Sequence, residues 1–175
     1  MRVFIALNLP KDIKSILFDL GREIRIRYPF IKPVPEGNLH ITLRFLGEIS
    51  EEKCEILKEN LKDLGKSFPL KLSKVGGFPT EMGARVIWVG FEEDKELVEL
   101  SFKVDTIVDS LGFPKRDKPF VPHITLARTE KPVNVENFKV KNLTFFAKEV
   151  VIYQSILAKP NAIYKSLKVI HLEGD

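Results

Sequence analysis

The sequence predicts strands and helices arranged as two similar lobes packed together in one compact domain. The chain has 175 residues, which is enough for one domain or for two fused lobes that share a core. The order of strands and helices in the first half resembles the order in the second half, and no Pro-, Gly- or Ser-rich linker separates them. Apolar residues make up 44% and charged residues 30%, a balance typical of globular chains.

The first half of the chain begins with an apolar strand. Side chains over 2–8 alternate between two largely apolar sets, which is typical of a strand covered on both faces. Apolar residues over 13–24 then recur at helical spacing until a Tyr-Pro pair ends the helix. A strand over 40–46 follows, and Ser50 is suited to cap a second helix whose first turn is acidic.

Two more strand-like segments follow, and after residue 92 the order resembles a second pass. Segments 70–76 and 84–91 are strand-like, and the Gly-Gly-Phe-Pro sequence at 76–79 predicts the turn between them. The remaining predicted elements are a helix over 95–111 and strands over 121–128, 142–153 and 163–171.

The charge and the apolar content of the chain bear on its cellular environment and on its binding partner. The formal net charge is +4 and the pI is about 9.1, which fits a polyanionic partner and fits an ordinary solvated surface equally well. No apolar run is long enough to span a bilayer, and the N-terminal apolar run is too short for a signal peptide. The single cysteine, Cys54, lies on the apolar face of its predicted helix and is expected to be buried. We therefore expect a cytoplasmic protein that does not associate with membranes.

One tetrapeptide occurs twice. The sequence His-Ile-Thr-Leu at 40–43 recurs at 123–126, in a chain with only 3 histidines. By average residue usage, a second histidine is followed by the same three residues in roughly one case in a few thousand. Chance is therefore a poor explanation for the repeat.

The spacing within each copy places two polar side chains on one face. Residues i and i+2 of a strand point the same way, so His40 and Thr42 share a face and Phe45 is expected on the opposite, core-facing side. In the second copy, His123 and Thr125 likewise share one face, and the residues that alternate with them point to the other. If the lobes pack with approximate two-fold symmetry, two imidazoles and two hydroxyls converge on one cleft.

This set of groups suits phosphoryl chemistry. Near neutral pH one imidazole can act as a base while the other acts as an acid, on opposite sides of a phosphorus atom under attack. A threonine hydroxyl can donate to a non-bridging phosphate oxygen. A zinc site is the alternative, but two histidines without a nearby cysteine or a zinc motif fit it poorly, so no metal and no cofactor are expected.

With these motifs the chain resembles the 2H phosphoesterase superfamily, which is named for two His-x-Thr/Ser motifs. Within it, the chain looks like the bacterial and archaeal RNA 2′,3′-cyclic phosphodiesterases, also called 2′-5′ RNA ligases. The resemblance extends over essentially the whole chain. The segments that carry it are 2–6, 38–48, 77–79, 85–90 and 120–128, together with Ser155 and Tyr164.

The resemblance implies an α+β, bilobed fold in which two similar antiparallel-sheet lobes carry helices on their outer faces and enclose a central groove. Residues 1–175 would then form a single domain with one motif in each lobe, at 40–42 and 123–125. The resemblance also implies hydrolysis of RNA 2′,3′-cyclic phosphate ends to 2′-phosphomonoesters, with reversible ATP-independent 2′-5′ joining in some members. By the same analogy His40 is the acid and His123 the base. Expected substrates include tRNA fragments, and a monomer is expected because the two lobes supply both halves of the site.

Further residues are candidates for contacts with the substrate. Thr42 and Thr125 are expected to bind phosphate oxygens, and Arg128 matches a family arginine that binds phosphate. Arg128 has the opposite strand parity to His123, so it needs a bend or a long reach. The candidate RNA contacts are Arg44, Phe4, Lys115 and Arg116.

Each of these four contacts has a simpler alternative. Arg44 shares the face of His40 by parity but can be a rim charge, and Phe4 can be core packing. Lys115 and Arg116 can be ordinary solvated loop charges. Family members often carry an aromatic residue before the first motif, where this chain has Lys-Pro-Val-Pro at 32–35, so stacking on a base at that point is in doubt.

Other functions fit parts of the sequence. A physiological 2′-5′ RNA ligase would use the same groups as the hydrolase. A non-catalytic module that binds RNA ends would need the groove but not a matched acid and base. A phosphodiesterase of small cyclic nucleotides is not separated from an RNA enzyme by the sequence, apart from the modest basic excess.

Overall fold

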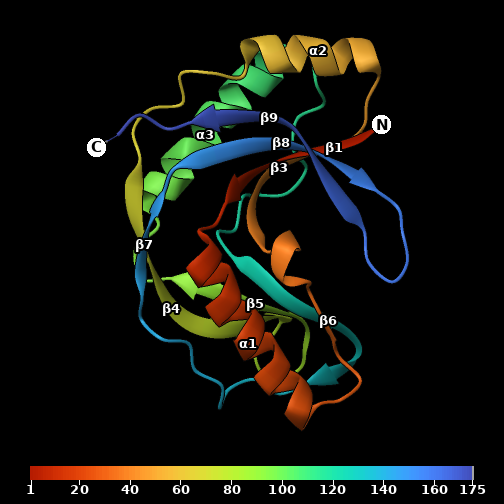
Figure 1. Ribbon diagram of the computed structural model, residues 1–175, viewed down its shortest axis with the longest axis vertical. Helices are drawn as coiled ribbons and strands as arrows, with labels where there is room; N and C mark the ends of the chain where they lie inside the picture. The colour runs from red at the N-terminus through yellow and green to blue at the C-terminus, as the bar shows by residue number, and fades with distance from the viewer. Residues whose placement is uncertain (175) are drawn as a thin grey trace.

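Two antiparallel sheets carry the strands of residues 1–174, the part of the chain that this computed structural model describes (Figure 1). The first sheet has the order β3 (His40–Glu48), β1 (Arg2–Asn8), β8 (Glu149–Ile156), β9 (Ile163–His171). The second has the order β2 (Lys32–Pro33), β6 (Ile124–Val133), β5 (Ala84–Phe91), β4 (Phe68–Pro79), β7 (Thr144–Ala147). The helices are α1 (Lys11–Arg27), the short η1 (Glu36–Asn38), α2 (Glu51–Asn60) and α3 (Lys95–Ser110). The predicted α+β, two-lobed fold is confirmed.

Each long helix packs against the sheet that does not contain the motif strand of its own half of the chain. Helix α1 follows β1 of the first sheet but contacts β2 and β6 of the second. Helix α3 leads into β6 of the second sheet but contacts β3 of the first. Figure 1 shows this exchange, with α1 lying beside β6 and α3 lying near β3. Each motif strand therefore packs against the helix that belongs to the other motif's half of the chain.

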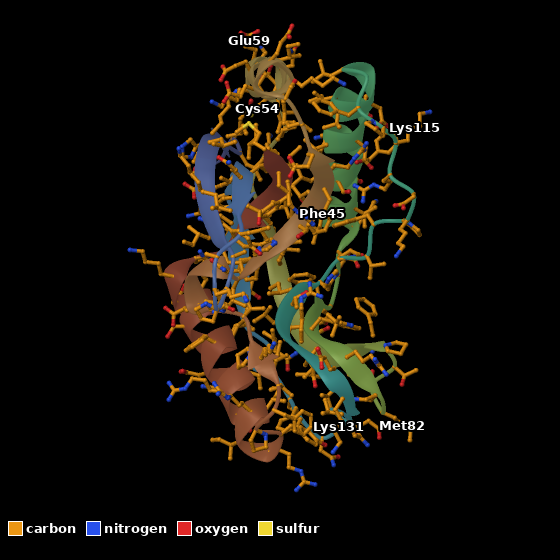
Figure 2. The ribbon with its side chains drawn as sticks, turned by 90° about the vertical axis from the view of Figure 1, so that its right-hand side faces the viewer. Phe45, Cys54, Glu59, Met82, Lys115 and Lys131 are labelled. Carbon is orange, nitrogen blue, oxygen red and sulfur yellow. The ribbon has the colours of Figure 1, made fainter. Side chains whose placement is uncertain are left out.

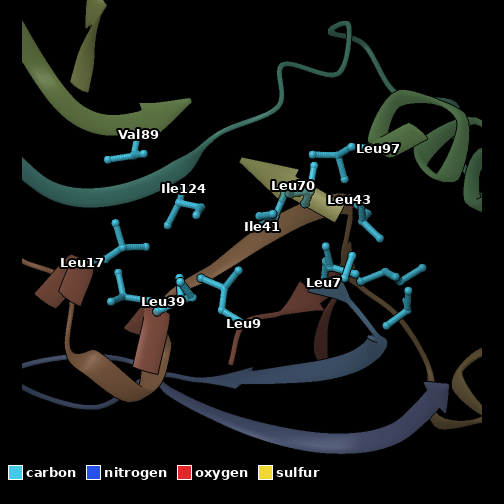
Figure 3. Close-up of a cluster of buried hydrophobic side chains, with 14 of the residues drawn as sticks. Leu7, Leu9, Leu17, Leu39, Ile41, Leu43, Leu70, Val89, Leu97 and Ile124 are labelled. Atoms are coloured by element: carbon cyan, nitrogen blue, oxygen red, sulfur yellow. The ribbon is translucent and has the colours of Figure 1, made fainter. Parts of the chain in front are cut away.

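One hydrophobic core joins the two sheets. Figure 3 shows side chains from both sheets meeting in it, including Leu7 and Ile41 from the first sheet and Leu70, Val89 and Ile124 from the second. These five side chains are at most 1% exposed. Burying each one contributes about 1.5–3 kcal/mol to folding, so the core holds the two motif strands in a fixed relation.

Three predicted boundaries were wrong. Residues 76–79 are not a turn, because β4 continues to Pro79. A Cβ atom on Gly76 would lie 2.3 Å from the ring of Trp88, so glycine serves there for close approach of an indole and not for chain reversal. The strand of the second motif begins at Ile124 and not at residue 121. Segment 142–153 divides into β7 and the start of β8, which belong to different sheets.

Two simpler expectations agree with the structure. Cys54 is buried on α2 as a free thiol. Within residues 1–174 no helix has the length and apolar character needed to cross a membrane.

Candidate functional site

A groove of about 330 Å³ lies between the two motif strands. It brings together all four polar side chains of the repeated motifs, His40 and Thr42 from β3 with His123 and Thr125 from the segment that opens and forms β6. The other side chains that line it are Arg2, Val3, Phe4, Val34, Asn38, Phe45, Arg128, Ser155 and Tyr164, together with Gly47.

The ring of His40 is held at both nitrogens. Its Nδ1 lies 2.6 Å from the carbonyl oxygen of Asn38, and its Nε2 lies 2.8 Å from Oγ1 of Thr42. A carbonyl oxygen can only accept, so Nδ1 carries the hydrogen and donates it. In the neutral ring Nε2 is then the acceptor for the Thr42 hydroxyl, and it is the nitrogen that can take up or release a proton.

His123 repeats the Nδ1 contact. Its Nδ1 lies 2.5 Å from the carbonyl oxygen of Val121, two residues upstream, just as Asn38 lies two residues upstream of His40. The contact fixes the same tautomer, with Nε2 as the free basic nitrogen. Each imidazole therefore presents the equivalent nitrogen for proton transfer.

The surroundings of both rings favour the neutral form. Burial lowers the pKa of His40 to about 4, and the positive groups of Lys14, His123 and Arg128 add to this effect. Burial, and secondly Arg128, also lowers the pKa of His123. Near neutral pH the groove thus holds two neutral bases. A phosphate anion bound in the groove would favour the imidazolium form of either ring.

Aromatic rings pack against both histidines. The Phe4 ring centroid lies 5.2 Å from that of His40, and the Phe78 centroid lies 5.3 Å from that of His123. Phe4 is only 4% exposed and also packs against Tyr153 and Tyr164. The Phe4 ring is thus largely buried, and it packs against His40 while also lining the groove.

A bulge interrupts each motif strand just after its threonine. Opposite β3, the neighbours Ile5 and Ala6 of β1 pair with Arg44 and Thr42, so Leu43 is the extra residue. Opposite β6, the neighbours Ile87 and Trp88 of β5 pair with Ala127 and Thr125, so Leu126 is the extra residue. An extra residue shifts the alternation of side chains by one position. The residue five positions after each histidine therefore turns toward the groove.

In the first motif this shift reverses two expectations. Phe45, expected in the core, is 70% exposed and lines the groove. Arg44, expected beside His40 as an RNA contact, is 2% exposed on the other side of the strand. Its guanidinium donates to Asp105 and Asp109, each at 2.8 Å, and to the carbonyl oxygen of Pro114 at 2.7 Å. The expected placement of Arg44 in the groove was wrong.

In the second motif the same shift supplies the bend that Arg128 needs. Its side chain is exposed and lines the groove with His123 and Thr125. Arg128 and Phe45 thus occupy equivalent positions in the two motif strands. A cation and an aromatic ring face the same space.

The two basic loop residues lie apart from the groove lining. Arg116 donates to Asp105 and to the carbonyl oxygen of Leu43, so its guanidinium is engaged within the protein. Lys115 is exposed, and Figure 2 shows it at the outer edge of its loop, away from Phe45.

Several lining residues were not assigned a role from the sequence. Arg2, Asn38 and Val34 contribute to the groove from the start of β1 and from the segment before β3. The shared parity of Arg2 and Phe4 was a signal for the first, whereas the other two lie outside regular strand patterns. Within residues 1–174 no group of three or more His, Cys, Asp or Glu side chains could hold a metal ion.

Comparison with known proteins places the chain among phosphoesterases. A family model described as LigT-like phosphoesterase matches residues 7–88. The chain is 35% identical to a Methanocaldococcus jannaschii protein named RNA 2′,3′-cyclic phosphodiesterase, over 96% of this chain and 99% of that protein. An Archaeoglobus fulgidus protein of the same name is also 35% identical, over 97% of this chain and 99% of its own length.

Solved structures agree with these relatives. A Thermus thermophilus protein superposes over the full length of both chains with a TM-score of 0.86 and 32% identity. Escherichia coli LigT complexed with 3′-AMP superposes over 98% of this chain and 97% of its own, with a TM-score of 0.80 and 29% identity. The similarity spans both motif strands and both sheets.

Proposed function

Since the chain belongs to the family of LigT-like phosphoesterases, we propose that it hydrolyses 2′,3′-cyclic phosphate ends of RNA to 2′-phosphomonoesters. One observation carries the proposal. Two neutral imidazoles, each held by its Nδ1 on the carbonyl oxygen two residues upstream, line one groove together with Arg128. The groove has the groups needed to bind a phosphate anion and to move two protons.

In the proposed reaction His123 acts as the base. Its Nε2 takes a proton from water, whose oxygen forms a new bond to phosphorus while the bond from phosphorus to the 3′ oxygen breaks. His40, protonated at Nε2 under the influence of the bound anion, delivers its proton to the departing 3′ oxygen. The phosphate stays on the 2′ oxygen. This division of roles follows the family resemblance.

Three further side chains are proposed to stabilise the phosphate. Oγ1 of Thr42 already lies within hydrogen-bonding distance of His40 Nε2, and it can donate to a non-bridging oxygen once Nε2 carries a proton. Thr125 can donate from the other motif. Arg128 supplies a fixed positive charge and paired N–H donors for the same oxygens.

RNA is the proposed substrate class because the groove offers more than phosphate-binding groups. The exposed ring of Phe45 can stack on an unpaired base, as aromatic side chains do in proteins that bind single-stranded RNA. The relatives named above carry RNA in their names. Lys115 remains a candidate contact for the RNA backbone beyond the groove. We further propose a single-domain cytoplasmic monomer, with tRNA fragments among its candidate substrates.

The same groups can also join RNA ends, with an RNA 5′-hydroxyl in place of the attacking water. The contact between His123 and Val121 lies at an exposed edge, which leaves room for that hydroxyl to approach His123. Its attack on the cyclic phosphate would form a 2′-5′ linkage and break the bond from phosphorus to the 3′ oxygen, without ATP. Ligation is therefore the second candidate activity, and joined RNA would be its product.

The direct test is incubation of the protein with RNA that ends in a 2′,3′-cyclic phosphate, followed by analysis of the end formed. A 2′-phosphate is expected. A 3′-phosphate would contradict the assigned leaving group, and binding without turnover would indicate an RNA-end binding module. Faster turnover of small 2′,3′-cyclic nucleotides than of RNA would favour the small-nucleotide enzyme. His171→Ala is the matched control for the loss of a histidine, since His171 is exposed and lies outside the groove lining.

A further inference from the structure

The carbonyl group of Leu43 is bound by a side chain from outside its sheet. Arg116 Nη2 donates to this oxygen at 2.6 Å. Leu43 is the extra residue of the bulge in β3, where the ladder of strand hydrogen bonds is interrupted and a backbone oxygen needs another donor. In β6 the carbonyl of the extra residue Leu126 is bound by the backbone N–H of Val34 at 2.8 Å. The bulge in β6 is thus held by a backbone group next to β2 of the same sheet, whereas the bulge in β3 depends on a side chain from a loop.

Arg116 is itself fixed by a second charged residue. Its Nε donates to one carboxylate oxygen of Asp105 at 2.9 Å, and its Nη2 donates to the other at 2.7 Å. Asp105 also accepts from the buried Arg44, which donates in addition to Asp109. Two arginines thus face two aspartates, so the charges balance, and a two-point contact of this kind restricts the guanidinium to one orientation.

The position of this network links the two motifs. Arg116 lies on the loop between α3 and β6, which leads to His123, whereas Leu43 lies in β3 between Thr42 and the groove-facing Phe45. The hydrogen bond therefore ties the approach to the second motif to the bulge of the first. Movement of the bulge would change where the Thr42 hydroxyl and the Phe45 ring point.

We propose that Arg116 is a positioning residue for the phosphodiesterase reaction, acting through the carbonyl group of Leu43 to hold Thr42 and Phe45 in the groove. The proposal rests on the proposed function. Its effect on catalysis is one of geometry, since a displacement of about 1 Å at a reacting group can cost on the order of 100-fold in rate.

The variant Arg116→Met keeps most of the apolar stem and removes the donors. We expect it to lower kcat by about 10- to 100-fold. Arg116→Lys, which retains a charged donor on a long side chain, is expected to recover part of that loss. Asp109→Asn is the matched control, because it weakens the same network at Arg44 without touching Arg116 or Leu43. It is expected to lower the melting temperature while kcat stays within about two-fold of wild type. Lys118→Met, on the same loop and exposed, controls for loss of loop charge.

A second readout does not depend on activity. NMR signals of the Thr42 methyl group and the His40 ring, recorded without substrate, are expected to move in Arg116→Met and to stay in place in Asp109→Asn. Wild-type kcat and unmoved signals in Arg116→Met would overturn the proposal, as would an equal loss of kcat in Asp109→Asn. If Arg116→Met does not fold, the kcat values and NMR signals of Arg116→Lys and Asp109→Asn are compared in its place. A lower kcat and moved signals in Arg116→Lys alone would support the proposal, and their absence would overturn it. If the wild-type protein does not hydrolyse the cyclic phosphate, the proposed function fails, while the NMR comparison still decides the positioning role.

Discussion

Replacing His40 with glutamine removes an imidazole whose pKa is lowered by burial to about 4, against about 6.5 for an ordinary histidine. Between these two values the unfolded chain binds a proton at this position and the folded chain does not. The free energy of unfolding of the wild-type protein is therefore expected to fall as the pH is lowered through that window. In His40→Gln this contribution to the pH dependence is absent.

The pKa values set the size of the effect. One pKa unit corresponds to about 1.4 kcal/mol, so complete titration from about 6.5 to about 4 is worth about 3 kcal/mol, of which about 2 kcal/mol is expressed at about pH 5. Between about pH 7.5 and pH 5 the wild-type protein should lose about 2 kcal/mol more than His40→Gln.

Urea unfolding of both proteins at the two pH values measures this difference. His171→Gln serves as the control, because His171 is an exposed histidine outside the groove lining. If the free energy of unfolding falls by the same amount in wild type and in His40→Gln between the two pH values, the reasoning that burial keeps His40 neutral is refuted.

Three further predictions concern substrate binding and turnover. Arg128→Met is expected to lower kcat/KM by about 10- to 100-fold in steady-state assays, because a charge-assisted hydrogen bond to phosphate is worth about 1.5–3 kcal/mol. An unchanged kcat/KM would contradict a role of Arg128 in phosphate binding. Phe45→Ala is expected to raise KM for RNA by about 10-fold or more while kcat changes little, since base stacking is worth about 1–3 kcal/mol. An unaltered KM would contradict a stacking role for Phe45. EDTA is expected to leave turnover unchanged because the imidazoles supply both proton transfers, whereas inhibition that added metal reverses would point to a metal site.

The sequence was most informative where a pattern repeats. The duplicated His-Ile-Thr-Leu led to the expectation of two polar strand faces, and the structure places His40, Thr42, His123 and Thr125 in one groove. The α+β fold of two lobes followed from the family resemblance and is confirmed. The crossing of α1 and α3 to opposite sheets was not predictable from local patterns, because helical periodicity shows that a face is apolar but not which sheet covers it.

The errors near the site have one main physical cause. Strand parity assumes an uninterrupted ladder, and the bulges at Leu43 and Leu126 break it. Arg44 consequently turns away from the groove while Phe45 turns toward it, the reverse of what alternation predicts. The same effect brings Arg128 into the groove against its parity. Nothing in the sequences Thr-Leu-Arg and Thr-Leu-Ala distinguishes a bulged strand from a regular one.

The misplaced turn has a different origin. Two glycines followed by Phe-Pro are typical of a chain reversal, yet Gly76 lies within β4 under the ring of Trp88. The need for a glycine there arises from a residue on the neighbouring strand. Only the pairing of β4 with β5 reveals it.

The pairing of His40 with His123 is tested most directly by single-turnover hydrolysis of cyclic-phosphate RNA with His40→Ala, His123→Ala and the double variant. Each single variant is expected to lose on the order of 10²- to 10⁴-fold in rate, with the fold intact by circular dichroism. Because the two rings serve one concerted displacement, the double variant should be scarcely slower than either single variant. A single variant with the wild-type rate, or losses that simply multiply in the double variant, would contradict the assignment of the two histidines as an acid–base pair.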